Sequence, residues 1–222
     1  MKKLYALIAA AVVLSFAAAA VFLMLSPDIV PMHYNFAGEI DRFGSKYENL
    51  IFPFLSLLTG AVFLLCARSM GRRGEVGSVK ALLITGAVTV FFFDGLGIFF
   101  MQKDLAFAAG EAVSVSAGQI VRFTGAATGI LLICLGCAMP RVARNSLFGL
   151  RTRWSMASDR LWEKSQRFAG RSAAGTGALM TALALWSPEG AVLYLSGAAV
   201  LVWAAACVLA SYLYYRAEKT EP

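Results

Sequence analysis

The sequence is poor in charge and in the residue types that most catalytic sites use. Its 222 residues include one histidine, and Asp, Glu, Lys and Arg together make up only 15%, whereas about 25% is typical of soluble domains. A single histidine, with no paired-acid, P-loop or nucleophile-elbow pattern, does not supply the common catalytic constellations. We therefore expect no enzymatic activity and no cofactor.

Metal ligands are also sparse. A zinc site usually needs more nitrogen or sulfur ligands than the single His33 supplies. Three acids nearby leave a metal-bound loop as the alternative: Asp28, Glu39 and Asp41. We expect no metal, and a hydrogen-bonding role for His33 that shapes a loop or a ligand site.

The four cysteines do not form a disulfide framework. Cys134 and Cys137 make a CxxC pair inside an apolar run, and Cys66 and Cys207 lie in other apolar runs. Thiols without access to water act mainly as small packing residues, so we expect no redox or metal function there.

What the sequence has in abundance is apolar residues. They make up 59% of the chain, and the mean hydropathy is +0.69. A soluble domain of this size could not cover so much apolar surface, and an aromatic content of 12% opposes disorder. Six runs approach the length of a membrane span: 4–25, 50–67, 79–101, 119–139, 173–187 and 191–213.

These runs predict an all-α polytopic membrane protein with six transmembrane helices. The fifth is the shortest, rising only about 22 Å, so it must begin within the preceding segment, tilt little or cross a thinned bilayer. The first is too long for the apolar core of a typical signal peptide, and we expect it to be retained as a span.

The distribution of basic residues predicts the orientation. The net charge is +7, which in a membrane protein indicates cytoplasmic loops rather than nucleic-acid binding. Most Lys and Arg residues lie before the first run, between the second and third, between the fourth and fifth, and after the sixth; the opposite side has only Arg42, Lys46 and Lys103. The positive-inside rule therefore places both termini in the cytoplasm.

Two charged residues lie within the predicted spans. Asp94 and Arg122 fall in the outer halves of neighbouring spans, and each is costly in lipid without a partner or a water-filled cavity. They predict an ion pair, and the alternative is that Arg122 extends to the headgroups. Small residues on the fourth and fifth spans predict close helix packing: Gly125, Gly129, Ala174, Ala178 and Ala182.

The two longest loops, 26–49 and 140–172, carry the candidate functional residues. The first is predicted outside the cell and contains prolines, glycines and polar groups between aromatic residues, so we expect a folded loop. The second is predicted in the cytoplasm. From Arg160 to Arg171 its pattern is typical of an amphipathic helix with a basic face lying in the headgroup region, which Ser158 is expected to cap.

Both loops contain motifs of known families. The first resembles the DUF1648 module through Pro27, Pro31, His33, Asn35, Gly38, Asp41, Gly44 and Lys46. The second resembles the SdpI family through Asn145, Phe148, Gly149, Arg151, Thr152, Trp154, Trp162 and Gly170. Met32 and Ser146 depart from residues that are frequent in these motifs, but no motif group is lost. We expect a DUF1648-like module over 1–118 and an SdpI-like module over 119–222, with an inverted repeat of three spans each as one arrangement.

The resemblance implies a bacterial cytoplasmic-membrane protein that gives immunity to a secreted antimicrobial peptide. We expect it to bind the peptide rather than to catalyse a reaction. The candidate sites are the outer-loop residues Pro31, His33, Asn35, Gly38, Asp41 and Lys46, and the cytoplasmic motif. One alternative is a transporter or lipid-handling protein that uses Asp94 and Arg122. Another is a signalling protein that recruits a cytoplasmic regulator through its basic inner helix. Expected partners are the lipid bilayer, a peptide toxin and such a regulator, but not nucleic acid.

Overall fold

The computed structural model describes residues 1–35, 40–110, 117–145 and 148–220, and within them the chain is almost entirely helical. The long helices are α1 (Lys2–Leu25), α2 (Ile51–Arg72), α3 (Val76–Ala108), α4 (Ala117–Ala138), α5 (Asp159–Trp186) and α6 (Glu189–Thr220). Two short strands, β1 (Ile29–Tyr34) and β2 (Ile40–Ser45), and two 3-10 turns, η1 (Lys46–Leu50) and η2 (Met139–Arg141), lie between them. The predicted all-α membrane fold is confirmed.

The helices are long and apolar enough for a membrane protein. Five segments of the described chain reach the length and hydropathy of a span: Lys2–Leu25, Lys46–Arg72, Val76–Ala108, Ile120–Arg141 and Gly190–Thr220. Their outward faces are apolar, and Leu14, Leu65 and Leu201 are each more than 60% exposed. Apolar patches of this extent are typical of surfaces that lipid covers.

The helix α5 differs from the predicted interfacial helix followed by a separate span. The basic segment beginning at Arg160 and the predicted fifth span are not separate; they form one continuous helix of 28 residues, about 42 Å long. The apolar face of the basic half does not lie on lipid headgroups, because Leu161, Trp162 and Ala169 are buried inside the protein. The expected cap is present, since Ser158 Oγ accepts a hydrogen bond from the Leu161 N–H at 3.1 Å.

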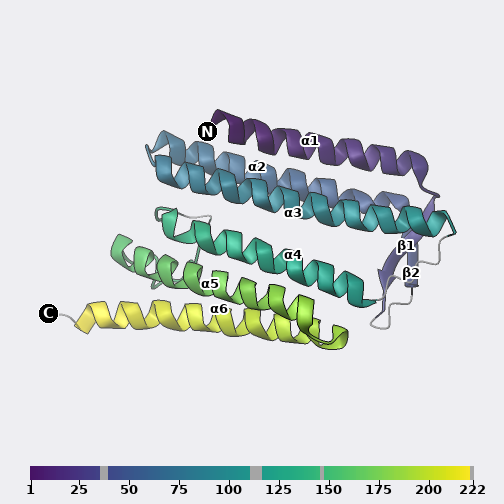
Figure 1. Ribbon diagram of the computed structural model, residues 1–222. Coiled ribbons are helices and arrows are strands. Elements are labelled where there is room, and N and C mark those ends of the chain that lie inside the picture. The colour runs from purple at the N-terminus through teal and green to yellow at the C-terminus, as the bar shows by residue number, and fades with distance from the viewer. Residues whose placement is uncertain (36–39, 111–116, 146–147, 221–222) are drawn as a thin grey trace.

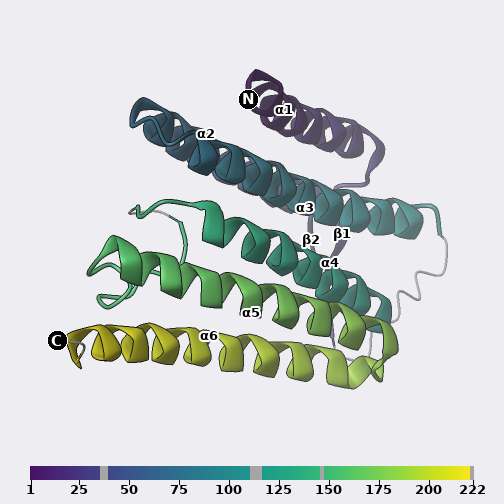
Figure 2. The same cartoon turned by 60° about the vertical axis from the view of Figure 1, so that its left-hand side comes forward.

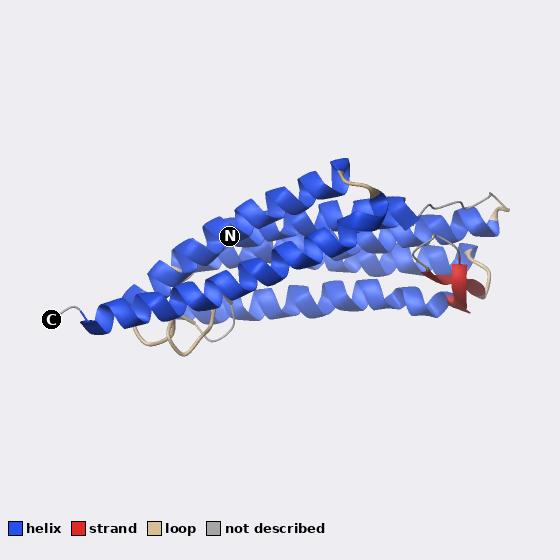
Figure 3. Cartoon of the chain, turned by 90° about the horizontal axis from the view of Figure 1, so that it is seen from below, coloured by secondary structure: helices blue, strands red, loops and turns tan. Residues whose placement is uncertain are grey.

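The helices run side by side as two sets of three, α1 to α3 and α4 to α6, with α3 beside α4 (Figures 1 and 2). Both termini lie at one end of the bundle, here called the terminal end, and the strands lie at the other, the hairpin end (Figure 1). Figure 3 shows the strands and the 142–158 loop at opposite ends. The module boundary at 118 and the inverted repeat stay predictions.

The helices within each of the two sets are packed in a different way. In the first set, apolar side chains from three helices form one core, with Ile8, Ala67, Leu82, Leu83 and Val90 fully or almost fully buried. In the second set, α4 and α5 approach so closely that their backbones meet at glycines. A Cβ built on Gly177 would lie 2.4 Å from the Gly129 carbonyl oxygen.

The small-residue face of α4 agrees with the sequence prediction, but that of α5 does not. Gly129 faces α5 as expected. The α5 contact is made by Gly170, Ala173, Gly177 and Thr181 and by the backbone of Ala174, whereas Ala178 is exposed. The predicted small-residue face of α5 was therefore wrong by part of a helical turn.

All four cysteines are free thiols.

Candidate functional site

The loop at the hairpin end is folded, and its core is an antiparallel pair of strands. Ile29 pairs with Ser45, Pro31 with Phe43 and Tyr34 with Ile40, with irregularities on either side of His33. Proline is tolerated in such a strand because it lies at a sheet edge. The expected folded loop is therefore present as a β-hairpin, although Gly38 lies outside the described residues.

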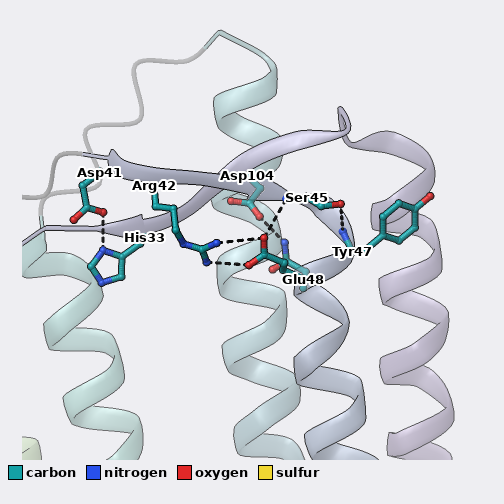
Figure 4. A network of polar contacts seen from close by, with 8 residues as sticks. His33, Asp41, Arg42, Ser45, Tyr47, Glu48 and Asp104 are labelled. Carbon is teal, nitrogen blue, oxygen red and sulfur yellow. Dashed lines mark hydrogen bonds and ion pairs between the residues drawn. The ribbon is translucent and has the colours of Figure 1, made fainter.

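His33 and Asp41 meet across the hairpin. His33 Nδ1 lies 2.6 Å from Asp41 Oδ1, and the two side chains are 64% and 42% exposed. Figure 4 shows both side chains pointing toward each other at the edge of the sheet. An exposed pair contributes little to stability, so this contact fixes the direction of two polar groups at the surface. Asn35 follows the end of β1.

A second ion pair on the same hairpin was missed in the sequence. Arg42 Nη2 lies 2.9 Å from Glu48 Oε2, and the hydrogen bond to Glu48 raises the pKa of the Arg42 guanidinium. Glu48 also accepts a hydrogen bond from the Ser45 backbone N–H at 3.2 Å, which completes a capping box with Ser45. The pattern Ser45-x-x-Glu48 is the signal that could have identified this group.

The base of the hairpin is fixed to the helices by polar contacts, one of which is buried. Lys46 Nζ donates to the Ser26 carbonyl oxygen at 3.2 Å and pairs with Asp28 at 3.1 Å. Asn49 Nδ2 donates to Asp104 Oδ2 at 2.9 Å, and both residues are only 3% exposed. These contacts join the hairpin to the ends of α1 and α3, so it is held in one position on the bundle.

Large apolar side chains lie among these charges. Ile29, Phe43 and Tyr47 are each more than half exposed, and the Phe43 ring lies 5.7 Å from that of Phe107 on α3. Exposed aromatic residues beside charged groups are typical of recognition surfaces. We call Ile29, His33, Asp41, Arg42, Phe43, Tyr47 and Glu48 the hairpin surface.

Asp94 and Arg122 have separate partners instead of the predicted ion pair. Asp94 accepts a hydrogen bond from the Ser56 hydroxyl of α2. It lines an apolar groove of about 490 Å³ that is formed mainly by α1 and α3. Arg122 donates to the backbone carbonyls of Ala184, Leu185 and Ser187 at 2.7–3.0 Å. A cation at these carbonyls complements the negative end of the α5 dipole.

At the terminal end, the predicted motif residues build a rigid loop. Asn145 closes a turn, because its Nδ2 donates to the Ala143 and Phe148 carbonyls and its Oδ1 accepts from the Phe148 N–H at 2.8 Å. Gly149 follows with a φ of +106°, a conformation that favours glycine. A Cβ there would also lie 2.5 Å from Gln166 Oε1.

The same loop is attached to α5 and α6. Gln166 of α5 donates from Nε2 to the Leu150 carbonyl at 2.9 Å and accepts from the Leu150 N–H at 3.0 Å. Trp162 donates to the Val142 carbonyl. The Thr152 hydroxyl lies 3.0 Å from that of Ser211, and Trp154 packs on Tyr212 of α6.

The contacts of these motif residues are thus mainly with the backbone of the loop and with α5 and α6. Gln166 and Ser211 were missed because a polar residue inside a helix carries no sequence signal for a distant hydrogen-bond partner, here the Leu150 backbone and the Thr152 hydroxyl. Arg151 differs from the other motif residues in being exposed. Within the described ranges, no group of three or more His, Cys, Asp or Glu side chains lies close enough to hold a metal ion.

Comparison with known proteins finds similarity to both families whose motifs the sequence resembles. Residues 141–214 match the model of the SdpI/YfhL protein family, and residues 10–57 match the domain of unknown function DUF1648. The chain is 33% identical over 92 residues to the Immunity protein SdpI of Bacillus subtilis strain 168.

That alignment covers 41% of this chain and 44% of the relative, so less than half of the relative's length is matched. No solved structure matches the chain. The two matched segments coincide with the hairpin end and with the loop, α5 and α6, in the order that the motifs predicted. Over residues 141–214 the chain is similar to the SdpI/YfhL protein family, and a segment similar to DUF1648 precedes this part.

Proposed function

We propose that this protein is an immunity protein of the bacterial cytoplasmic membrane that binds a secreted antimicrobial peptide at the hairpin surface. The similarity to the Immunity protein SdpI supports immunity in general. The observation that carries the proposal is the hairpin itself. It presents charged and aromatic side chains while its base is held by the buried Asn49–Asp104 hydrogen bond.

The orientation is part of the proposal. Lys2, Lys3, the α2–α3 turn and the 142–158 loop gather basic residues at the terminal end. By the positive-inside rule this end faces the cytoplasm, and the hairpin surface then faces the exterior, where a secreted peptide arrives.

The chemistry of the hairpin surface suits binding. His33 and Asp41 form one polar pair and Arg42 and Glu48 a second, with Phe43 and Tyr47 exposed beside them. Antimicrobial peptides are amphipathic, so a surface of paired charges and aromatic rings offers contacts to both of their faces. Because the base of the hairpin is already fixed on the helices, less conformational entropy is lost when a peptide binds. The separate partners of Asp94 and Arg122 give no support to a transporter.

Replacing His33 with alanine, or Asp41 with asparagine, is expected to lower survival of a sensitive strain that depends on this protein. The loss of one oriented polar contact corresponds to about a tenfold weaker interaction. The measurement is survival of cells expressing each variant and challenged with a purified peptide against which the unchanged protein protects. Immunoblots verify equal abundance in the membrane.

The matched control is Glu163→Gln, which removes an exposed ion pair with Arg167 at the terminal end. It is expected to protect as well as the unchanged protein. Protection that survives both hairpin substitutions, or that falls equally in the control, would contradict the proposed role of the hairpin surface.

A further inference from the structure

A groove at the terminal end combines an apolar wall with one exposed cation. Its volume is about 330 Å³, and it lies between α4, α6 and the 142–158 loop. Leu132 and Leu135 of α4 and Ala204 and Val208 of α6 form the apolar wall, and Arg151 lies at the loop. The groove is therefore amphipathic along its length.

The groove extends from the loop into the apolar part of the bundle. Leu132 of α4 precedes Met139, a lining residue at the start of η2, by seven positions, or about 10 Å along the helix axis. The rings of Trp154 and Tyr212 contact each other at the loop in a tilted arrangement, with centroids 5.0 Å apart, and Trp and Tyr are enriched at the headgroup level of membrane proteins. An elongated apolar ligand with its polar end at Arg151 would therefore have the same polarity profile as the surrounding lipid.

The loop holds Arg151 in place without using its charge. The residues on both sides of Arg151 are fixed by hydrogen bonds. Leu150 is hydrogen-bonded to Gln166 and Thr152 to Ser211. Arg151 itself is exposed, and no hydrogen bond or ion pair to another described residue is found for it. Because guanidinium groups bind phosphate in bidentate geometry, this position is suited to a phosphate group.

We propose that this groove is a binding site for one anionic phospholipid of the membrane leaflet at the terminal end. Arg151 binds the phosphate, and an acyl chain lies between α4 and α6. The site is at the opposite end of the bundle from the hairpin surface, so it is independent of peptide binding. The lipid would join the SdpI motif loop to the two helices that flank it.

The test is lipid binding by the purified full-length protein, measured by native mass spectrometry in detergent with phosphatidylglycerol or phosphatidylcholine added. Phosphatidylglycerol is expected to bind at least about tenfold more tightly than phosphatidylcholine. Arg151→Gln is expected to remove most of this preference. Its neighbour variant Arg153→Gln, which changes a cation stacked on Trp154 and not lining the groove, is expected to keep it.

A second variant tests the apolar half of the site. Ala204 is exposed on α6, so Ala204→Trp should fill the groove without changing the charge or the fold, and it is expected to abolish tight phosphatidylglycerol binding. Equal binding of both lipids, an unchanged preference in Arg151→Gln or Ala204→Trp, or displacement of the lipid by inorganic phosphate at the same concentration would overturn the proposal.

Discussion

Replacing Gly177 with leucine is expected to destabilise the protein by about 3 kcal/mol, the upper end of the usual cost of overpacking. The reason is that two of the three atoms nearest to an added Cβ at Gly177 belong to the α4 backbone. A Cβ at this position would lie 2.4 Å from the Gly129 carbonyl and 2.9 Å from the Ile133 nitrogen. Neither group can move unless α4 and α5 separate, which would also break their remaining glycine contacts.

Gly175→Leu provides the control within the same helix. Gly175 has no atom within 4 Å of an added Cβ and is exposed, and leucine has a higher helix propensity than glycine. Its stability is therefore expected to be unchanged or slightly higher. Thermal unfolding of both variants in detergent measures the difference, and equal melting temperatures would show that the α4–α5 contact is not as close as described.

Replacing Gln166 with leucine is expected to cost about 1–3 kcal/mol, since it leaves the N–H of Leu150 without a side-chain partner and its C=O with only the Ser155 hydroxyl. Leucine has nearly the same volume, so the loss comes from hydrogen bonding rather than from a cavity. The 142–158 loop contains Arg144, Arg151 and Arg153. Its release from α5 would make the peptide bonds after these arginines accessible to trypsin. The melting temperature should fall, and tryptic cleavage within the loop should become faster.

Gln166→Glu separates the two hydrogen bonds. The carboxylate still accepts from the Leu150 N–H but cannot donate to its carbonyl unless protonated. The fall in melting temperature is expected to be smaller than for Gln166→Leu. If trypsin cleaves both variants at the same rate as the unchanged protein, the loop is not attached to α5 through Gln166.

The helices could be predicted from the sequence because apolar runs of membrane length leave few other structures. The run 79–101, for example, lies within α3 (Val76–Ala108). The cap at Ser158 was also predictable, since the capping hydrogen bond joins its side chain to the Leu161 N–H of its own helix. Such local features depend on neighbouring residues and not on the tertiary arrangement.

The surroundings of each helix could not be predicted. The basic half of α5 has the pattern of an interfacial helix, but Trp162 donates to the Val142 carbonyl, and the apolar face is covered by protein instead of lipid. A helical pattern predicts that a face is buried without indicating what buries it. For the same reason the depth of Asp94 and Arg122 did not reveal their partners, Ser56 and the carboxyl end of α5.

The hairpin was predicted only as a folded loop. Pro31 lowers the strand signal of β1, and the pairing of Asn49 with Asp104 joins residues 55 positions apart, which no local pattern indicates. His33 and Asp41 were identified through a family motif, and the structure adds that they contact each other.

The most direct test of the account is which side of the membrane each end of the bundle faces. Single cysteines at Tyr47 of the hairpin surface and at Ala157 of the loop, both exposed positions, would be introduced after the four native cysteines are replaced by serine. In intact cells a membrane-impermeant maleimide should label Tyr47→Cys, and it should label Ala157→Cys only after permeabilisation. Labelling of Ala157→Cys alone in intact cells would place the hairpin surface in the cytoplasm and contradict its role in binding a secreted peptide.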